Sequence, residues 1–370
     1  MGERPVSVHV VATQLCSRVP GGTGRYVEEL LRGLVRVRPD RAHVTAVATR
    51  ACQAVDRLGV GIERLAPPLS VLARLWERGL PPVPRATDVL HAPTLMVPPL
   101  RPGAALVVTV HDVVPWTHPE TLTSHGVAFH RRMARRAAAE AAVIVTPTEA
   151  VAVRVRELLA PTGPVHVVRP GVPMMRAPGD GQQRREARGL RRPYVLFVGT
   201  AEPRKGLDVL VTALARPALA DLDLVVVGPA GWGDADVGEM ARRARVSDRV
   251  HVTGRVDDAE LAALYAGAQA LAMPSRAEGF GFPVVEAMAH GVPVVVSADP
   301  ALTEVAGDAA DVVPVGDAEA LAEALAQAAA GGPSRERRVA QGRARAAELD
   351  WDRTAVTMWS LYESVSRDRG

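Results

Sequence analysis

Short apolar runs alternate with amphipathic segments along the whole chain, and this alternation predicts parallel β-sheets covered by helices. In the first half, strand-like runs lie at 6–13, 43–48, 88–91, 105–110, 143–147 and 165–168. Helical periodicity fills 25–37, 123–140 and 149–159, and Thr148 is well placed as the N-cap of the last helix.

A second series of strands and helices follows residues 171–193, a stretch rich in Gly, Pro and charge that we interpret as a linker with one short helix. Its strands are expected at 194–199, 222–227, 250–252, 270–273, 292–296 and 311–313, and a final amphipathic helix is expected beyond 350. A chain of 370 residues is longer than one core usually serves. We therefore predict an α/β protein of two Rossmann-like domains, 1–180 and 181–350, which face an interdomain cleft where ligands bind.

Composition narrows the class of protein. The hydrophobic content of 48% and charged content of 23% are typical of a globular chain, and no apolar run approaches the ~20 residues that cross a bilayer. We expect no signal peptide, because the first residues lack a small-residue cleavage site, and two cysteines, Cys16 and Cys52, are too few for a disulfide scaffold or a zinc cluster. We expect a cytoplasmic protein.

Charge is distributed unevenly between the two halves. Residues 1–180 carry a net charge of +8 and the remainder −5, which favours an anionic partner for the first domain. The predicted helix at 123–140 carries Arg131, Arg132, Arg135 and Arg136. Peripheral contact of this basic domain with the inner membrane face is one interpretation, and a solvated helix face is the one we favour.

A glycine cluster, PGGTGRY at 20–26, follows the first strand and opens the first helix. Gly21 and Gly22 would let the backbone approach a phosphate beside free helix N–H groups. Val27 replaces the third glycine of the GxGxxG pattern, which argues against a nicotinamide or flavin enzyme. A plain tight turn is the alternative.

The segment GTAEPRKGLDVL at 199–210 places Arg204 and Lys205 where the chain enters a helix. Two cations there oppose the helix dipole, and a bound diphosphate would reverse that cost. Lys205 is the only lysine beside 43 arginines, which favours a specific use of its compact ammonium group. A solvated charged turn is the alternative.

The strongest motif is MPSRAEGFGFPVVEAMAHGVPVV at 273–295. Glu278 lies in the loop and Glu286 lies eight positions on, in the helix that Pro283 opens and Gly291 ends. Carboxylates accept hydrogen bonds from vicinal hydroxyls, so the pair suits a sugar or ribose. The acid–nucleophile pair of a glycosidase is the competing use.

The run from Glu278 to Glu286 resembles the E-x7-E element of retaining GT-B glycosyltransferases of family 4. The segments GTAEPRKG and PGGTGRY fall in the right order, and VHDVVPWTHPE at 110–120 is similar to the acceptor-side histidine segment of that family. The resemblance covers essentially the whole chain. It implies a GT-B fold whose C-terminal helix, 351–370, crosses back onto the N-terminal acceptor domain, while 181–350 binds the nucleotide sugar.

The resemblance also implies residue roles. Glu286 would bind the ribose hydroxyls, and Glu278 would contact the donor sugar. Stabilisation of the diphosphate would fall to Arg204 and Lys205. Phe280 and Gly281 would contact the sugar through their backbone N–H groups, and Gly22 would place its N–H on the distal phosphate, with Gly21 beside it in the donor-binding loop. Arg255 and Val256 would cradle the base, and His111 would lie near the reaction centre. Many relatives carry a basic residue where this chain has Thr200, which leaves open how Arg204 and Lys205 divide the phosphate task.

The implied reaction moves a hexosyl group, with GDP-mannose as the favoured donor, to a hydroxyl of a glycan, a lipid-linked intermediate or a secondary metabolite. We expect no bound metal or cofactor and no nucleic-acid partner. Alternatives on the same architecture are a sugar-nucleotide epimerase, a phosphorylase and a non-catalytic nucleotide-sugar-binding partner protein. A phosphorylase needs a lysine for pyridoxal phosphate, and the only lysine already lies in the phosphate loop.

Overall fold

The computed structural model describes residues 5–17, 20–173, 175–231 and 236–367. The chain forms two compact units: Met1–Gly171 together with Leu349–Gly370, and Val172–Glu348. The sequence predicted boundaries at 180 and 350, within ten residues of these positions. Each unit is described by itself.

The described part of the first unit contains a parallel sheet in the order β3-β2-β1-β4-β5-β6-β7. Its strands are β1 Ser7–Val11, β2 His43–Thr49, β3 Gly61–Leu65, β4 Val89–Ala92, β5 Ala105–Thr109, β6 Val143–Thr146 and β7 Val165–Val167. β4, β5 and β6 are buried along their whole length, as expected for a parallel sheet covered on both faces. The strand order reverses beside β1, where β2 and β4 flank it.

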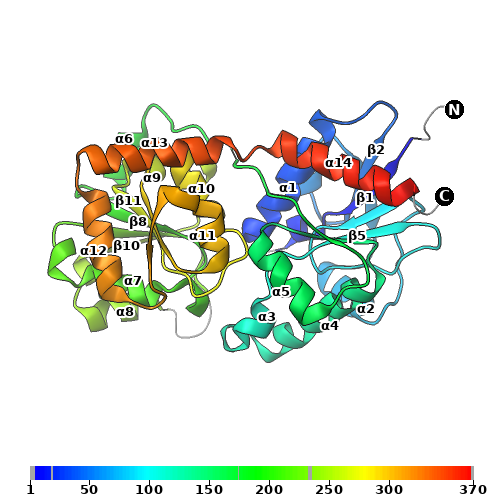
Figure 1. The fold of residues 1–370 in the computed structure, drawn as a ribbon, viewed down its shortest axis with the longest axis horizontal. Coiled ribbons are helices and arrows are strands. Elements are labelled where there is room, and N and C mark those ends of the chain that lie inside the picture. The colour runs from blue at the N-terminus through cyan, green and yellow to red at the C-terminus, as the bar shows by residue number, and fades with distance from the viewer. Residues whose placement is uncertain (1–4, 18–19, 174, 232–235, 368–370) are drawn as a thin grey trace. The chain divides into compact units, whose positions relative to one another are not determined.

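Six α-helices accompany this sheet in the described residues: α1 Gly21–Arg36, α2 Leu69–Glu77, α3 Val114–Thr117, α4 Ser124–Glu140, α5 Glu149–Leu159 and α14 Trp351–Arg367. α5 matches its predicted bounds, and Thr148 caps it by accepting a hydrogen bond from the Val151 amide. α14 packs along α1 (Figure 1), and the Trp359 indole donates to the Leu34 carbonyl at 3.0 Å. The C-terminal helix is thus part of the core of the first unit.

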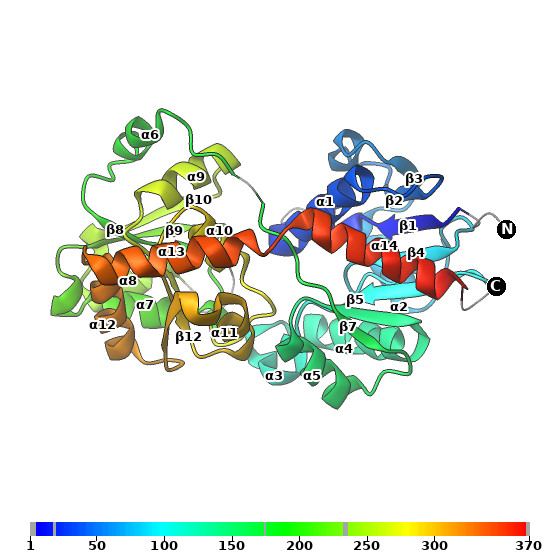
Figure 2. The same ribbon diagram turned by 45° about the horizontal axis from the view of Figure 1, so that its top comes forward.

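The second unit has a parallel sheet in the order β10-β9-β8-β11-β12-β13 in its described part. The strands are β8 Tyr194–Val198, β9 Asp223–Val227, β10 Val250–Gly254, β11 Ala270–Met273, β12 Val294–Ser297 and β13 Ala310–Val313. Its helices are α6 Gly181–Ala187, α7 Leu207–Leu214, α8 Val237–Ala244, α9 Asp258–Gly267, α10 Phe282–Ala289, α11 Pro300–Ala306, α12 Ala318–Ala329 and α13 Pro333–Ala347. Figure 2 shows α13 running beside α10, which agrees with their contacts.

The strand order of the second unit reverses at β8, which has β9 on one side and β11 on the other. The loops that leave β8 and β11 follow neighbouring strands at this reversal, which is the position at the carboxyl edge where open parallel sheets bind ligands. The segment 199–210 includes the first of these loops, and the segment 273–295 includes the second. Within the described ranges, no helix is both long and apolar enough to span a membrane.

Four features of the first unit differ from the sequence prediction. β3, α2 and the short α3 were not predicted, and α1 begins at Gly21 rather than at 25. Glycines disfavour a helix interior, so they masked the first turn of α1. Gly24 is nevertheless required there, because a Cβ at this position would lie 2.3 Å from Cβ of Pro20.

Candidate functional site

The loop after β8 and the loop after β11 pack directly against each other. Gly206 is left-handed, with φ of +69°, and a Cβ on it would lie 2.1 Å from the Pro274 carbonyl oxygen. The Arg276 amide donates to the Arg204 carbonyl at 2.7 Å. Only glycine permits this approach, which brings the segments 199–210 and 273–295 together.

The Glu278 carboxylate is the centre of the resulting cluster. Its Oε1 is 2.5 Å from Lys205 Nζ and accepts a hydrogen bond from Ser275 Oγ at 2.8 Å, while Oε2 lies 3.0 Å from Arg204 Nη1. Arg204 also pairs with Glu202 at 2.7 Å. The four charged side chains are almost fully buried and balance one another in charge.

Burial and charge act in opposite directions on these groups. Burial by itself would raise the pKa of Glu278, but Lys205 and Arg204 outweigh it and lower that pKa to about 2. Burial, followed by the neighbouring Arg204 charge, lowers the pKa of Lys205, against the attraction of Glu278. Glu278 is therefore ionised at every pH at which the protein is assayed.

Arg204 and Lys205 lie at the entry to a helix, as the sequence predicted. Both lie in a short 3₁₀ turn, Pro203–Lys205, ahead of α7, and Gly206 is the N-cap of that helix. Both cations pair with Glu278 of the loop after β11. The sequence analysis assigned these three residues to the donor site, but it did not predict their direct contact.

Glu286 lies in the second turn of α10 and is 3% exposed. The Tyr265 hydroxyl donates a hydrogen bond to its Oε2 at 2.8 Å. Pro283 stands in the first turn of α10 and Gly291, with φ of +72°, follows its end, as predicted.

The start of α10 is defined by Gly281, its N-cap, with φ of +89°. A Cβ on Gly281 would lie 2.6 Å from Leu302 Cδ2, so a side chain has no room there. Phe280 is buried edge-on against Phe282. The amides of Phe280 and Gly281 precede the helix at the carboxyl edge of β11, the placement that donation to a ligand requires.

The predicted base-cradling residues, Arg255 and Val256, directly follow β10. Arg255 is exposed and Val256 is half-buried. β10 is two strands from β8, and all these strands are parallel, so their carboxyl ends share one edge of the sheet. The structure therefore places this segment on the same edge as Glu278.

In the first unit, Gly21 and Gly22 form the first turn of α1, and His111 follows β5. His111 Nε2 lies 2.8 Å from the Pro93 carbonyl, and its ring meets Tyr26 of α1 edge-on at 4.7 Å. Burial lowers the pKa of His111, so the imidazole is neutral at pH 7 and holds its proton on Nε2. Its Nδ1 is then an acceptor.

Several residues around Glu278 and Glu286 escaped the sequence analysis: Glu202, Tyr265, Ser275, His290 and Asp299. Asp299 caps α11 by accepting from the amides of Ala301 and Leu302, and its other oxygen accepts from the Glu278 amide at 3.3 Å. Burial raises the pKa of Asp299. An Asp directly before Pro300 is a helix-start signal that would have identified the cap but not its contact with Glu278.

The arginines of α4 are largely engaged within the first unit. Arg131 donates to the Pro115 carbonyl and lies over Trp116. Arg132 pairs with Glu77, and Arg136 pairs with Glu140. Three of the four arginines of this face therefore have a structural partner within the first unit.

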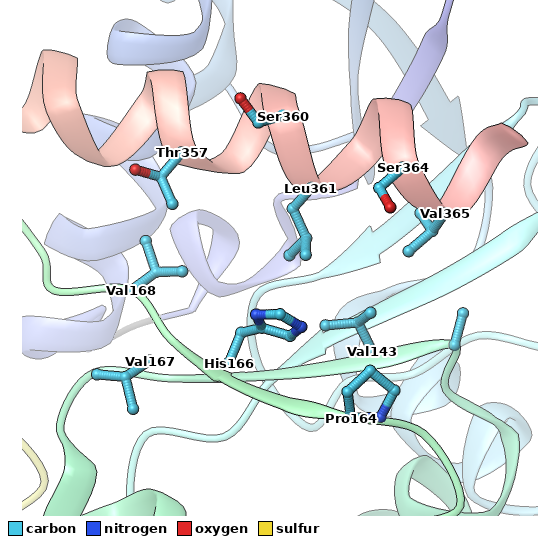
Figure 3. Close-up of a pocket in the computed structure, with 11 residues that line it drawn as sticks. Val143, Pro164, His166, Val167, Val168, Thr357, Ser360, Leu361, Ser364 and Val365 are labelled. Carbon is cyan, nitrogen blue, oxygen red and sulfur yellow. The ribbon is translucent and has the colours of Figure 1, made fainter. Parts of the chain in front are cut away.

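A hollow of about 570 Å³ lies between β7 and α14 (Figure 3). Its lining includes His166, Val168, Leu361 and Ser364, and none of the predicted site residues. It is separate from the candidate site.

Comparison with known proteins agrees with this geometry. Residues 180–345 match the family described as "Glycosyl transferases group 1", and residues 20–176 match "Glycosyltransferase Family 4". Each of the two domains thus matches a glycosyltransferase family model. Over 173 residues it is 34% identical to O-antigen chain mannosyltransferase B of Escherichia coli, covering 46% of this chain and 45% of that protein. The matched segment thus spans about half the length of such curated relatives.

Solved glycosyltransferase structures share the fold over nearly the whole chain. Sucrose-phosphate synthase from Thermosynechococcus elongatus aligns with a TM-score of 0.77 at 20% identity, covering 98% of this chain and 99% of that one. Anabaena Alr3699/HepE, solved in complex with UDP-glucose, aligns with a TM-score of 0.70 at 19% identity, covering 96% and 100%. The two parallel-sheet domains of this chain form the GT-B fold.

Proposed function

We propose that the protein is a retaining glycosyltransferase that moves a hexosyl group from a nucleoside diphosphate sugar to a hydroxyl acceptor. The observation that carries the proposal is the cluster of Glu278 with Arg204 and Lys205. It lies where the strand order of the second unit reverses, and Glu286 lies on the helix that follows the Glu278 loop. It groups cations for a diphosphate with carboxylates for hydroxyls at the edge where open parallel sheets bind ligands.

The leaving group is the chemical demand on this site. The bond from the anomeric carbon to the diphosphate oxygen breaks, the acceptor oxygen bonds to that carbon on the same face, and the acceptor proton passes to the departing phosphate. Arg204 and Lys205 stabilise the charge that grows on the diphosphate, the largest contribution in this kind of catalysis. We propose that these cations make a bound metal unnecessary.

Glu278 has a second task in this proposal. Without donor it neutralises both cations, so an arriving diphosphate competes with it for Arg204 and Lys205. The carboxylate then has capacity to accept hydrogen bonds from sugar hydroxyls, beside the amides of Phe280 and Gly281. Glu286 takes the ribose hydroxyls, while Arg255 and Val256 border the base.

The first unit supplies the acceptor side of the reaction. Gly21 and Gly22, at the first turn of α1, offer amides to the distal phosphate. Neutral His111 is assigned to the reaction centre, where its Nδ1 accepts hydrogen bonds. The net charge of +8 over residues 1–180 suits an anionic acceptor or a peripheral contact with an acidic membrane surface.

For the donor, GDP-mannose is favoured because the Escherichia coli relative is named a mannosyltransferase. The complex of Alr3699/HepE with UDP-glucose makes UDP-sugars the second candidate. The acceptor class includes glycans, lipid-linked intermediates and secondary metabolites, with no nucleic-acid partner. A cytoplasmic location follows from the use of nucleotide sugars.

The test is release of nucleoside diphosphate from a panel of UDP-, GDP-, dTDP- and ADP-sugars. Slow release from one donor, abolished by Glu286→Ala and retained by Glu323→Ala, would support the proposal. Glu323 is an exposed residue of α12 in the same unit and serves as the matched control. Tight nucleotide binding without turnover, with and without acceptor mixtures, would instead favour a non-catalytic binding protein.

A further inference from the structure

Tyr265 is the aromatic residue that hydrogen-bonds to Glu286, the predicted ribose-binding carboxylate. It lies on α9 with no exposed surface, and its hydroxyl donates to Glu286 Oε2 at 2.8 Å. α9 precedes β11 and α10 follows it, so the hydrogen bond joins the two helices that flank one central strand. The bond is fully enclosed by protein.

His290 completes the arrangement. Its ring stacks on Tyr265 with centroids 5.1 Å apart and an interplanar angle of 21°. Its Nδ1 lies 2.8 Å from the Glu286 carbonyl oxygen, so Nδ1 carries the proton and donates. In the described part of the chain, the buried Nε2 atom of His290 has no hydrogen-bond partner, so the ring contributes to this arrangement by packing. The Tyr265 ring is therefore packed against His290, and its hydroxyl hydrogen-bonds to the Glu286 carboxylate.

A hydrogen bond to one carboxylate oxygen has a geometric consequence. The terminal torsion of a glutamate side chain is broad and soft, so an unheld carboxylate samples many orientations. Recognition of two vicinal hydroxyls requires one orientation, and ordering the side chain on binding would weaken affinity. The Tyr265 hydroxyl sets that orientation in advance.

We propose that Tyr265 is a positioning residue that fixes the Glu286 carboxylate for the ribose hydroxyls and thereby sets the preference for ribonucleotides over their deoxy forms. The inference rests on the proposed function, because it assumes that Glu286 meets the ribose. It goes further in assigning sugar discrimination to a buried residue that does not touch the nucleotide.

The test compares binding of GDP and UDP with their 2′,3′-dideoxy forms by isothermal titration calorimetry. Tyr265→Phe keeps the ring and its stacking and removes only the hydroxyl. Tyr194→Phe is the matched control: the buried Tyr194 hydroxyl of the same unit donates to the Leu264 carbonyl at 2.6 Å, and neither group belongs to the Glu286 carboxylate. Thermal unfolding of both variants reports any general loss of stability.

Tyr265→Phe is expected to reduce the preference for the ribonucleotide about tenfold, the size of one hydrogen bond to a charged group. Tyr194→Phe should leave the preference unchanged. In a Glu286→Gln background, the effect of Tyr265→Phe should shrink to near zero, because a residue acting through Glu286 has nothing left to position.

Two results would overturn the inference, and they separate it from the proposed function. A wild-type preference that survives in Tyr265→Phe would refute the positioning role alone. Absence of any ribonucleotide preference in the wild-type protein would refute both this role and the assignment of Glu286 to the ribose. Should Tyr265→Phe fold poorly, the cycle measured with Tyr265→Leu, which likewise cannot donate a hydrogen bond, and Glu286→Gln gives the same comparison.

Discussion

Replacing Lys205 with methionine removes its ammonium group and keeps most of its aliphatic length. The substitution leaves Glu278 with Arg204 and Ser275 as its remaining partners in the buried cluster. The consequence follows from the electrostatics of that carboxylate.

In the wild-type protein, the pKa of Glu278 is about 2, against an ordinary value of 4.5. A depression of about 2.5 units corresponds to about 3 kcal/mol of stability, present above pH 4.5 and lost as pH falls toward 2. Burial and Arg204 lower the pKa of Lys205, so keeping its ammonium charged in the folded protein offsets part of the stability that Glu278 contributes. We therefore expect Lys205→Met to lose about 2 kcal/mol at pH 7.

The pH dependence distinguishes this account from a simple packing effect. Without Lys205, burial brings the pKa of Glu278 back toward its ordinary value, so the variant gains little from ionisation. The stability difference between wild type and Lys205→Met should narrow by about 1 kcal/mol between pH 7 and pH 3.5. In a Glu278→Gln background, it should not change with pH.

These differences in the free energy of unfolding are measured by urea unfolding at each pH. Hydrogen exchange in peptides of the second unit monitors the unfolding, so the second unit is measured separately from the first. A difference of the same size at pH 7 and pH 3.5 would refute the reasoning, because Lys205 would then not act through the charge of Glu278. Nucleotide release should be lost in Lys205→Met at all pH values.

Three further predictions concern the scaffold. His91 is fully buried with a pKa lowered to about 3 by burial, so the first unit should lose about 2 kcal/mol as pH falls from 7 to 5, and His91→Gln should flatten that urea-unfolding profile. Gly206→Ala should lower the melting temperature and abolish nucleotide release because its Cβ would collide with Pro274, whereas Gly254→Ala, also at φ of +69° but with open space around it, should cost only about 1 kcal/mol of backbone strain. Truncating Trp359→Ala should cost about 3–5 kcal/mol in chemical unfolding of the first unit, and a smaller loss would show that α14 contributes little to its core.

Much of the architecture was predictable because its strands are buried on both faces and read as continuous apolar runs. The segment 194–199 is of this kind, and β8 lies within one residue of it. β3 escaped because it is an edge strand in which exposed positions alternate with buried ones and Glu63 takes a buried place. The first turn of α1 escaped because glycine has a low helix propensity, which does not report the close approach of Gly24 to Pro20.

The residues of the site were predictable from the sequence, but the contacts between them were not. The spacing of Glu278 and Glu286 suggested a hydroxyl-binding pair, but nothing in the spacing indicated that Lys205, 73 positions earlier, lies 2.5 Å from Glu278. That contact depends on Gly206 packing against the Pro274 backbone, a property of the folded sheet. Tyr265 carries no motif signal, and only the structure shows its hydroxyl on Glu286.

A crystal structure of the protein with the nucleoside diphosphate of its preferred donor tests the central claim most directly. The account predicts the ribose hydroxyls on the Glu286 carboxylate and the diphosphate within hydrogen-bonding distance of Arg204 and Lys205, with the Lys205–Glu278 contact lengthened. A nucleotide bound elsewhere, or bound at this edge without contact to Glu286, would contradict it.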